Sequence, residues 1–253
     1  MQVGKSAQFR QPSALERFAS SAGRVLPAPI RTALRGSYER TLRHLRPDRL
    51  VCTLPGGERI RLLPSLRHVT WNSDEYDAFR RDVRPGDVVF DIGANVGAYT
   101  MLYAQWVGPE GRVYAFEPAS EPFHGLKQLL DANGLSSRVV AVQAAVADSE
   151  GVAAVTIDAV CQRERVMPRL IKVDVEGAEL EVLRGARDTI TAGGAGLKLY
   201  VEMHPSLWAD YTAMRTALET EFALLKRRPE RLDGDPAIWN IEGVCLRLVP
   251  CES

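Results

Sequence analysis

Long apolar runs are missing from this sequence of 253 residues. A membrane-spanning helix needs roughly 18 or more consecutive apolar residues, and charged residues interrupt every window of that length. The first residues also lack a short apolar stretch followed by a small-residue cleavage site, which a secretory signal requires. We therefore expect no membrane span and a cytoplasmic location.

Cysteines and aromatic residues are also scarce. The four cysteines show no C-x-x-C spacing, which argues against a zinc site, and they are expected to be reduced thiols. Aromatic residues make up 7% of the chain, so alanine, valine and leucine must fill most of the core. Such a core is typical of a parallel sheet covered by helices.

The formal net charge is zero, but the charges are unevenly distributed. Residues 1–50 hold ten basic and three acidic residues, a balance of +7, and the rest of the chain carries −7. This segment could be a basic arm for nucleic acid, anionic lipid or an acidic partner, or a solvated helical appendage. Because no aromatic residues or binding motifs are interleaved with the arginines, we favour the appendage and expect no nucleic-acid partner.

Residues 1–83 are predicted to form an N-terminal segment. Apolar spacing predicts two helices within residues 13–46, separated at Pro27 and Pro29. Two short apolar stretches around Pro55-Gly56-Gly57 predict a β-hairpin, Leu50–Leu54 with Arg59–Leu63. A short helix, Asp74–Asp82, is expected to be capped by Ser73 or Asp74.

Residues 84–253 are predicted to form a Rossmann-like α/β domain, because apolar strands alternate with helical stretches. The predicted strands are Val88–Asp91, Arg112–Phe116, Val139–Gln143, Leu170–Asp174 and Leu197–Glu202. The predicted helices are Ala98–Val107, Glu121–Ala132, Ala159–Arg165 and Ala178–Ile190. Right-handed crossovers would make this sheet mainly parallel, with two antiparallel strands, Phe222–Leu225 and Val244–Leu248, added at the end.

The strongest motif follows the first of these strands, at residues 91–100. A strand ends in Asp91, a turn contains Gly93, Asn95 and Gly97, and a helix begins, so backbone N–H groups are available to a ligand. A dinucleotide site has the pattern G-x-G-x-x-G, but here Asn95 replaces the middle glycine that admits a pyrophosphate. The acid suits a ligand with an ammonium group, such as the methionine part of S-adenosylmethionine.

Acids also follow the next two strands. Glu117 is placed to accept hydrogen bonds from both hydroxyls of a ribose, in NAD or in S-adenosylmethionine. After the third strand, small residues including Ala145 could form the floor of an adenine pocket. Asp148 could line that pocket or could simply be an acid in a turn.

A second motif spans the fourth and fifth strands. Asp174, soon followed by Glu176, ends one strand, and Glu202 and His204 lie at the end of the next, so all are expected at one edge of the sheet. Two carboxylates and an imidazole could provide a base with its orienting partner, or a divalent-metal site. A histidine in a turn without a catalytic role is as plausible for His204. Lys172 is expected to be a buried ion-pair partner rather than a catalytic lysine.

With these residues in view, the chain resembles the FkbM family of class I methyltransferases. The matching stretches are DIGANVGAYT at 91–100, FEP at 116–118, IKVDVEGAELEVLRGA at 171–186 and VEMHP at 201–205. The resemblance implies O-methylation of a hydroxyl on a secondary metabolite, sugar or glycan, with S-adenosylmethionine as cofactor. It assigns cofactor contacts to Asp91, Gly93, Asn95, Gly97, Thr100 and Glu117, and an active-site role to Asp174.

Two alternatives to methyl transfer remain, an NAD-dependent oxidoreductase and a non-catalytic binding module with the same fold. The segment 149–169 is shorter than its counterpart in most members of the family. Either the acceptor cleft is wide and exposed above Asp174 and His204, or a loop between about Asp148 and Thr156 is absent from the sequence. Within the segment, Thr156–Arg165 is expected to form a helical turn or two, with Val155, Ile157 and Val160 packed on the sheet.

Overall fold

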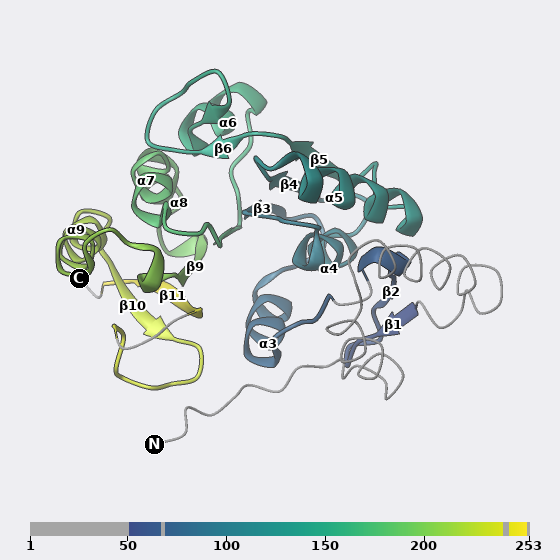
Figure 1. The fold of residues 1–253 in the computed structure, drawn as a ribbon, viewed down its shortest axis with the longest axis horizontal. Coiled ribbons are helices and arrows are strands. Elements are labelled where there is room, and N and C mark those ends of the chain that lie inside the picture. Colours follow the sequence, from purple (N-terminus) through teal and green to yellow (C-terminus); the bar gives the residue numbers. More distant parts are fainter. Residues whose placement is uncertain (1–50, 67–68, 240–242, 252–253) are drawn as a thin grey trace, which may run out of the picture.

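The computed structural model describes residues 51–66, 69–239 and 243–251 (Figure 1). The two helices predicted within residues 13–46 lie outside the described residues. A seven-stranded sheet forms the centre of the protein, in the order β10-β11-β9-β8-β3-β4-β5. Its strands are β3 (Val88–Ile92), β4 (Arg112–Phe116), β5 (Val139–Val142), β8 (Leu170–Val173), β9 (Lys198–Met203), β10 (Arg227–Arg231) and β11 (Val244–Pro250).

The five strands from β9 to β5 are parallel, whereas β11 is antiparallel to both β9 and β10. This arrangement confirms the predicted Rossmann-like fold, with a mainly parallel sheet and antiparallel strands at its C-terminal end. Short two-stranded pairings stand outside the sheet. They are the hairpin of β1 (Val51–Thr53) with β2 (Arg59–Arg61), and the parallel pair of β6 (Ala145–Val146) with β7 (Ala154–Val155).

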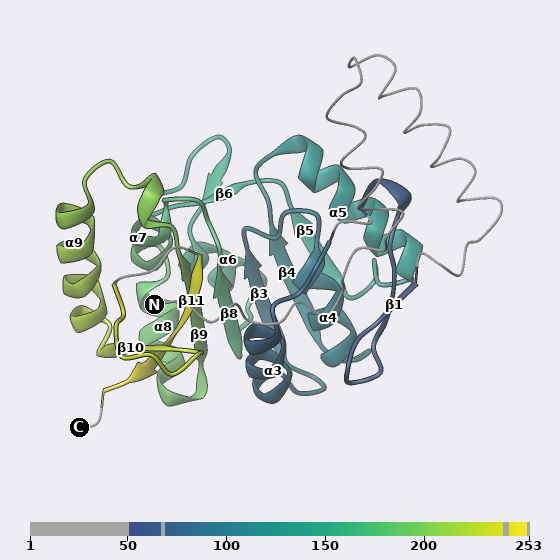
Figure 2. The same cartoon turned by 60° about the horizontal axis from the view of Figure 1, so that its bottom comes forward.

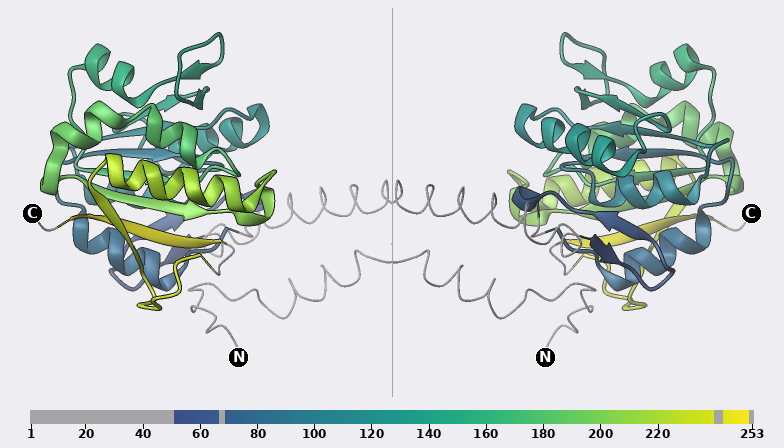
Figure 3. Two further views of the ribbon diagram at one scale, coloured as in Figure 1. Left: turned by 90° about the vertical axis from the view of Figure 1, so that its left-hand side faces the viewer. Right: turned by 90° about the vertical axis from the view of Figure 1, so that its right-hand side faces the viewer.

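Helices cover both faces of the sheet, and each face has its own hydrophobic cluster (Figures 2 and 3). One cluster joins the sheet to the hairpin and to α3 (Ser73–Asp82), α4 (Ala98–Trp106) and α5 (Ser120–Asn133). The other joins it to α6 (Ile157–Glu164), α7 (Glu179–Arg184), α8 (Arg187–Gly193) and α9 (Tyr211–Leu224). Burial on both faces explains why the central parallel strands are mostly apolar.

The N-terminal hairpin is attached to the helices of the first face. Ile60 is fully buried in the cluster that also contains Phe79 of α3. Glu58, just before β2, accepts hydrogen bonds from the Tyr76 hydroxyl at 2.6 Å and from Nε1 of Trp106 at 2.7 Å. The hairpin therefore shares a core with the sheet, while the division of the chain at residue 84 stays a prediction.

Three local predictions were wrong. The apolar run Phe222–Leu225 is not a strand but the end of α9, where Leu218 and Phe222 are buried one helical turn apart; the strand follows as β10. The cap of α3 is Asn72, whose side chain accepts from two backbone N–H groups. The helix predicted over 178–190 is divided into α7 and α8 at Gly185, where a Cβ would lie 2.0 Å from the Ala147 carbonyl oxygen.

The segment 149–169 contains β7 and α6, and α6 is capped by the Thr156 side chain. Ile157 and Val160 are fully buried, as predicted from the sequence. The exposed acceptor cleft above Asp174 and His204 stays a prediction.

The order of the strands also indicates at which edge of the sheet a ligand is expected to bind. From β3 the chain continues to β4 and β5 on one side, and it returns to the other side of β3 with β8. Ligands of open α/β sheets bind beyond the carboxyl ends of the strands at such a change of direction. Here the carboxyl ends of β3 and β8 carry the glycine-rich turn and Asp174, respectively.

Candidate active site

The glycine-rich turn is pressed against the end of β8. Gly93 has a φ of +79°, and a Cβ on it would lie 1.8 Å from the Asp174 carbonyl oxygen. Only glycine satisfies both the positive φ and this close approach. The N–H groups of Gly93 and Ala94 both donate to the Phe116 carbonyl, so the turn is also tied to β4.

Glu117 is buried at the carboxyl end of β4, with 7% of its surface exposed. Oε2 accepts from the backbone N–H of Asn95 at 2.9 Å, and Oε1 accepts from that of Ala119 at 2.8 Å. Each oxygen of a carboxylate can accept two hydrogen bonds. One acceptor position therefore remains on each oxygen, which fits two neighbouring ribose hydroxyls.

Asp91 is almost completely buried and has an orphaned atom. Oδ2 accepts from the Thr100 hydroxyl, whereas Oδ1 has no hydrogen-bond partner among the described residues. Burial raises the pKa of the Asp91 carboxyl, and the Lys172 ammonium and the Thr100 hydrogen bond act in the opposite direction. The free oxygen fits a donor from a ligand, such as an ammonium group, while Thr100 contributes by holding Asp91.

Lys172 is the buried cation of the site. Its Nζ donates to Oδ2 of Asp174 at 2.8 Å and lies 5.3 Å from the centre of the Tyr99 ring, so the predicted ion pair is present. Burial raises the pKa of the Asp174 carboxyl, but the neighbouring Lys172 outweighs burial and keeps that pKa below its usual value. Asp174 is therefore ionised at neutral pH.

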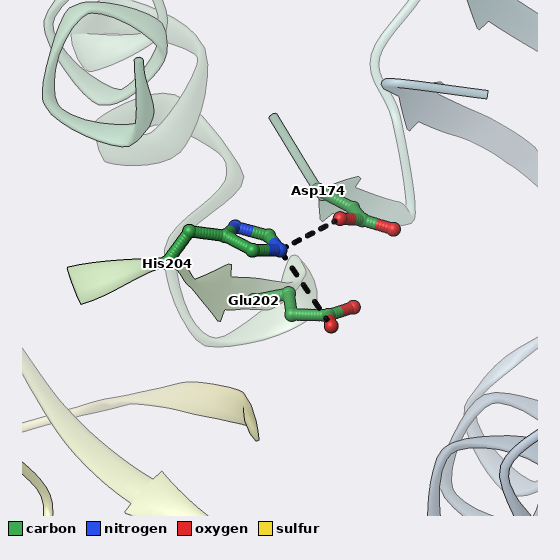
Figure 4. A group of neighbouring side chains, drawn as sticks. All are labelled: Asp174, Glu202 and His204. Atoms are coloured by element: carbon green, nitrogen blue, oxygen red, sulfur yellow. Dashed lines mark ion pairs between the residues drawn. The ribbon is translucent and has the colours of Figure 1, made fainter. Parts of the chain in front are cut away.

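His204 lies between three carboxylates. Its Nδ1 is 3.0 Å from Oε1 of Glu179, and its Nε2 lies 3.6 Å from Oδ1 of Asp174 and 3.8 Å from Oε1 of Glu202 (Figure 4). The hydrogen bond to Glu179 is the largest cause that raises the pKa of His204, to about 8. The sequence prediction that Asp174, Glu202 and His204 lie together at one edge of the sheet agrees with this geometry.

The pKa of Glu202 is shifted in the opposite direction from that of Asp174. Burial and then the charge of Asp174 raise the pKa of Glu202 to about 7. The two carboxyls are thus separated in acidity by their environments, since Lys172 contacts Asp174 directly. Pairs with separated pKa values are typical of sites that move protons.

Two buried acids of the site were not singled out from the sequence. Glu179 is fully buried at the start of α7. Glu75 of α3 is 6% exposed, and its negative charge helps to raise the pKa of Lys172. A signal existed, because each is an acid on the apolar face of its helix. Glu179 precedes Val182 and Leu183 by three and four residues, and Glu75 precedes Phe79 by four.

Other acids near the motifs do not join the cluster. Glu176 is exposed, and among the described residues it does not belong to any cluster that could ligate a metal ion. Asp148 is exposed and accepts from the Ser149 hydroxyl at 3.2 Å, as expected of an acid in a turn. Ala145 is partly buried in β6, opposite Ala154.

Comparison with known proteins finds a match over the part of the chain that holds the second motif. Residues 129–224 match the methyltransferase FkbM domain, a range that includes Asp174, Glu179, Glu202 and His204. A curated relative, the 31-O-demethyl-FK506 methyltransferase FkbM of Streptomyces tacrolimicus, is 47% identical over 77 residues. That alignment covers 30% of this chain and 28% of the relative, so most of both sequences lies outside it.

A solved structure shows the same fold at low sequence identity. A candidate rRNA methylase from Clostridium thermocellum has a TM-score of 0.51 at 14% identity, over 70% of this chain and 95% of its own. Methyltransferase FkbM from Methylobacillus flagellatus has a TM-score of 0.49 at 20% identity, over 70% of this chain and 50% of its own. Within the described residues, no helix combines the length and the apolar character that crossing a membrane requires. The domain match and the curated relative thus show that part of this chain is similar to FkbM methyltransferases.

Proposed function

We propose that the chain is an S-adenosylmethionine-dependent methyltransferase that transfers a methyl group to a hydroxyl of a small molecule, such as a secondary metabolite, sugar or glycan. The observation that carries the proposal is the edge where β3 and β8 meet. There the glycine-rich turn, the orphaned oxygen of Asp91 and the buried Glu117 lie beside the group formed by Asp174, Glu202 and His204.

The residues present fit S-adenosylmethionine on chemical grounds. The free Oδ1 of Asp91 suits the ammonium group of the methionine part, and the remaining acceptor positions of Glu117 suit the ribose hydroxyls. Asn95 has a φ of 50°, in the left-handed region. Its backbone N–H donates to Glu117, and its side chain is exposed. The cofactor supplies an activated methyl group, so the protein mainly has to align the acceptor and exclude water.

The acceptor proton is taken by His204 or by a carboxyl beside Asp174. Glu179 holds Nδ1 of His204, and this bond directs Nε2 toward the place where Asp174 and Glu202 converge (Figure 4). Trp208 donates from Nε1 to the second oxygen of Glu179 at 3.1 Å, so Glu179 is itself fixed. A base positioned in this way typically contributes about 10²–10⁴-fold to a rate.

The choice of a hydroxyl acceptor has separate support. The name of the curated relative describes methylation of 31-O-demethyl-FK506, and the matched family domain covers the acceptor-side residues of this chain. We extend that chemistry to this protein as part of the proposal, together with a cytoplasmic location.

The test has two steps. Isothermal titration with S-adenosylhomocysteine and with NAD should show binding of the first only, and binding of NAD alone would favour an oxidoreductase. A transfer assay with methyl-labelled S-adenosylmethionine and candidate hydroxyl metabolites should then give a labelled ether. Cofactor binding without transfer to any hydroxyl, but with salt-sensitive binding of nucleic acid or lipid, would favour a non-catalytic module.

A further inference from the structure

We propose that Asp174, Glu202 and His204 bind one divalent transition-metal ion, with Mn²⁺ or Zn²⁺ preferred to Mg²⁺. One ligand atom from each residue lies within 4.8 Å of the other two. The distances from Nε2 of His204, 3.6 Å to Asp174 and 3.8 Å to Glu202, exceed those of ordinary hydrogen bonds. Two atoms at about 2.1 Å from one ion are roughly 3.0 Å apart at a right angle and roughly 3.6 Å apart at 120°. The gaps therefore match those bridged by a shared ion.

The histidine is held as metal-ligating histidines usually are. A ligating imidazole commonly donates its other N–H to a carboxylate, which fixes the ring and leaves a lone pair for the metal. Here Nδ1 of His204 meets Oε1 of Glu179 at 3.0 Å, and Glu179 is fully buried and also held by Trp208. With the proton on Nδ1, the lone pair of Nε2 faces Asp174 and Glu202 (Figure 4).

The ion pair with Lys172 leaves the proposed ligand atom of Asp174 available. Lys172 contacts Oδ2, whereas His204 faces Oδ1. The charges also favour a further cation, because Asp174, Asp91, Glu202 and Glu75 all act on the ammonium of Lys172. Unbalanced buried charge is costly, and a bound divalent ion would offset much of this excess.

The ligand set indicates the kind of ion. Imidazole nitrogen is favoured by first-row transition metals, while Mg²⁺ and Ca²⁺ prefer ligands that are all oxygen. The side chains of His204, Glu202 and Asp174 are 15%, 18% and 30% exposed, so a bound ion would keep positions open for an oxygen of the acceptor. With Nε2 of His204 on the ion, the acceptor proton would be taken by a carboxyl beside Asp174 instead. Use of the ion to position an acceptor rests on the proposed methyl transfer, but ion binding itself does not.

The experiment measures metal binding by the full chain without cofactor or acceptor. Titration calorimetry with MnCl₂ is expected to show one saturable site per chain, and Glu202→Gln is expected to weaken it at least tenfold. Glu176→Gln is the matched control, because it removes the same charge from an exposed carboxyl that does not join the cluster. It should bind as the wild type does, and circular dichroism should show that both variants are folded.

Pulsed electron paramagnetic resonance of the Mn²⁺-loaded protein then identifies the ligand. Coupling to an imidazole nitrogen is expected in the wild type and should be lost in His204→Gln. The proposal is overturned if neither Mn²⁺ nor Zn²⁺ binds at millimolar concentration, if Glu202→Gln binds as tightly as the control, or if no nitrogen coupling is seen. Because none of these measurements depends on methyl transfer, a negative result here is distinct from failure of the proposed enzymatic function.

Discussion

Gly93→Ala should both destabilise the fold and disturb the site, because Gly93 joins the glycine-rich turn to the end of β8. Its φ of +79° costs a residue with a side chain about 1–2 kcal/mol. In addition, the new Cβ would lie 1.8 Å from the Asp174 carbonyl oxygen, and a backbone atom cannot move aside as a flexible side chain can. Overpacking of this kind typically costs a further 1–3 kcal/mol, so we expect a total loss of about 2–5 kcal/mol.

The matched control is Gly86→Ala, at the other end of β3. Gly86 has a φ of +87°, but a Cβ on it would meet nothing within 4 Å, so this variant should lose only the conformational part, about 1–2 kcal/mol. Urea unfolding followed by circular dichroism gives both free energies of unfolding. Equal losses in the two variants would refute the argument, since they would show that contact with Asp174 does not constrain the turn. A folded Gly93→Ala should also bind S-adenosylhomocysteine more weakly than Gly86→Ala.

Three further results are expected. Glu117→Ala should weaken binding of S-adenosylhomocysteine by about 1–3 kcal/mol in titration calorimetry, because ribose hydroxyls lose their acceptors; an unchanged Kd in the folded variant would remove Glu117 from the site. His204→Ala and Asp174→Asn should lower turnover about 10²–10⁴-fold with little change in cofactor affinity, and full turnover of His204→Ala at every pH would place the base elsewhere. Burial raises the pKa of Glu58, but hydrogen bonds, chiefly from Tyr76, outweigh burial and keep the pKa below its ordinary value of 4.5. The ionised Glu58 therefore stabilises the fold above pH 4.5, and this stabilisation is lost as the pH falls through the folded-state pKa. Glu58→Gln should therefore lower the melting temperature at pH 7 and approach the wild type in acid, and a difference that does not shrink in acid would contradict the assignment.

The main pattern of the fold could be predicted from the sequence because it is local. The strands β3, β4 and β8 are mostly apolar, and an acid stands at or just after the end of each, at Asp91, Glu117 and Asp174. A buried parallel strand needs just such a run, and the glycines of the turn needed no partner to be recognised. The order of these motifs along the chain was enough to indicate a resemblance to the FkbM family.

Short apolar segments were where the sequence was ambiguous. Phe222–Leu225 has the composition of a strand, but it completes a helix whose apolar residues are spaced one turn apart, beginning with Leu218. Four residues contain little more than one helical turn, so periodicity over that length cannot separate the two structures. The division between α7 and α8 depended on contact with the Ala147 carbonyl, which is 38 residues from Gly185 in the chain.

The sequence by itself determined the alternation of strands and helices, the glycine-rich turn and the acids that follow the strands, because each depends on residues that are neighbours in the chain. Only the tertiary structure decided which charges meet. Lys172 pairs with Asp174 rather than with Asp91 on the adjacent strand, and Glu179 crosses from α7 to hold His204. Such contacts depend on the order of the strands in the sheet and on how deeply the acidic side chains of each helix are buried. Both are set by packing of the whole domain rather than by any local sequence pattern.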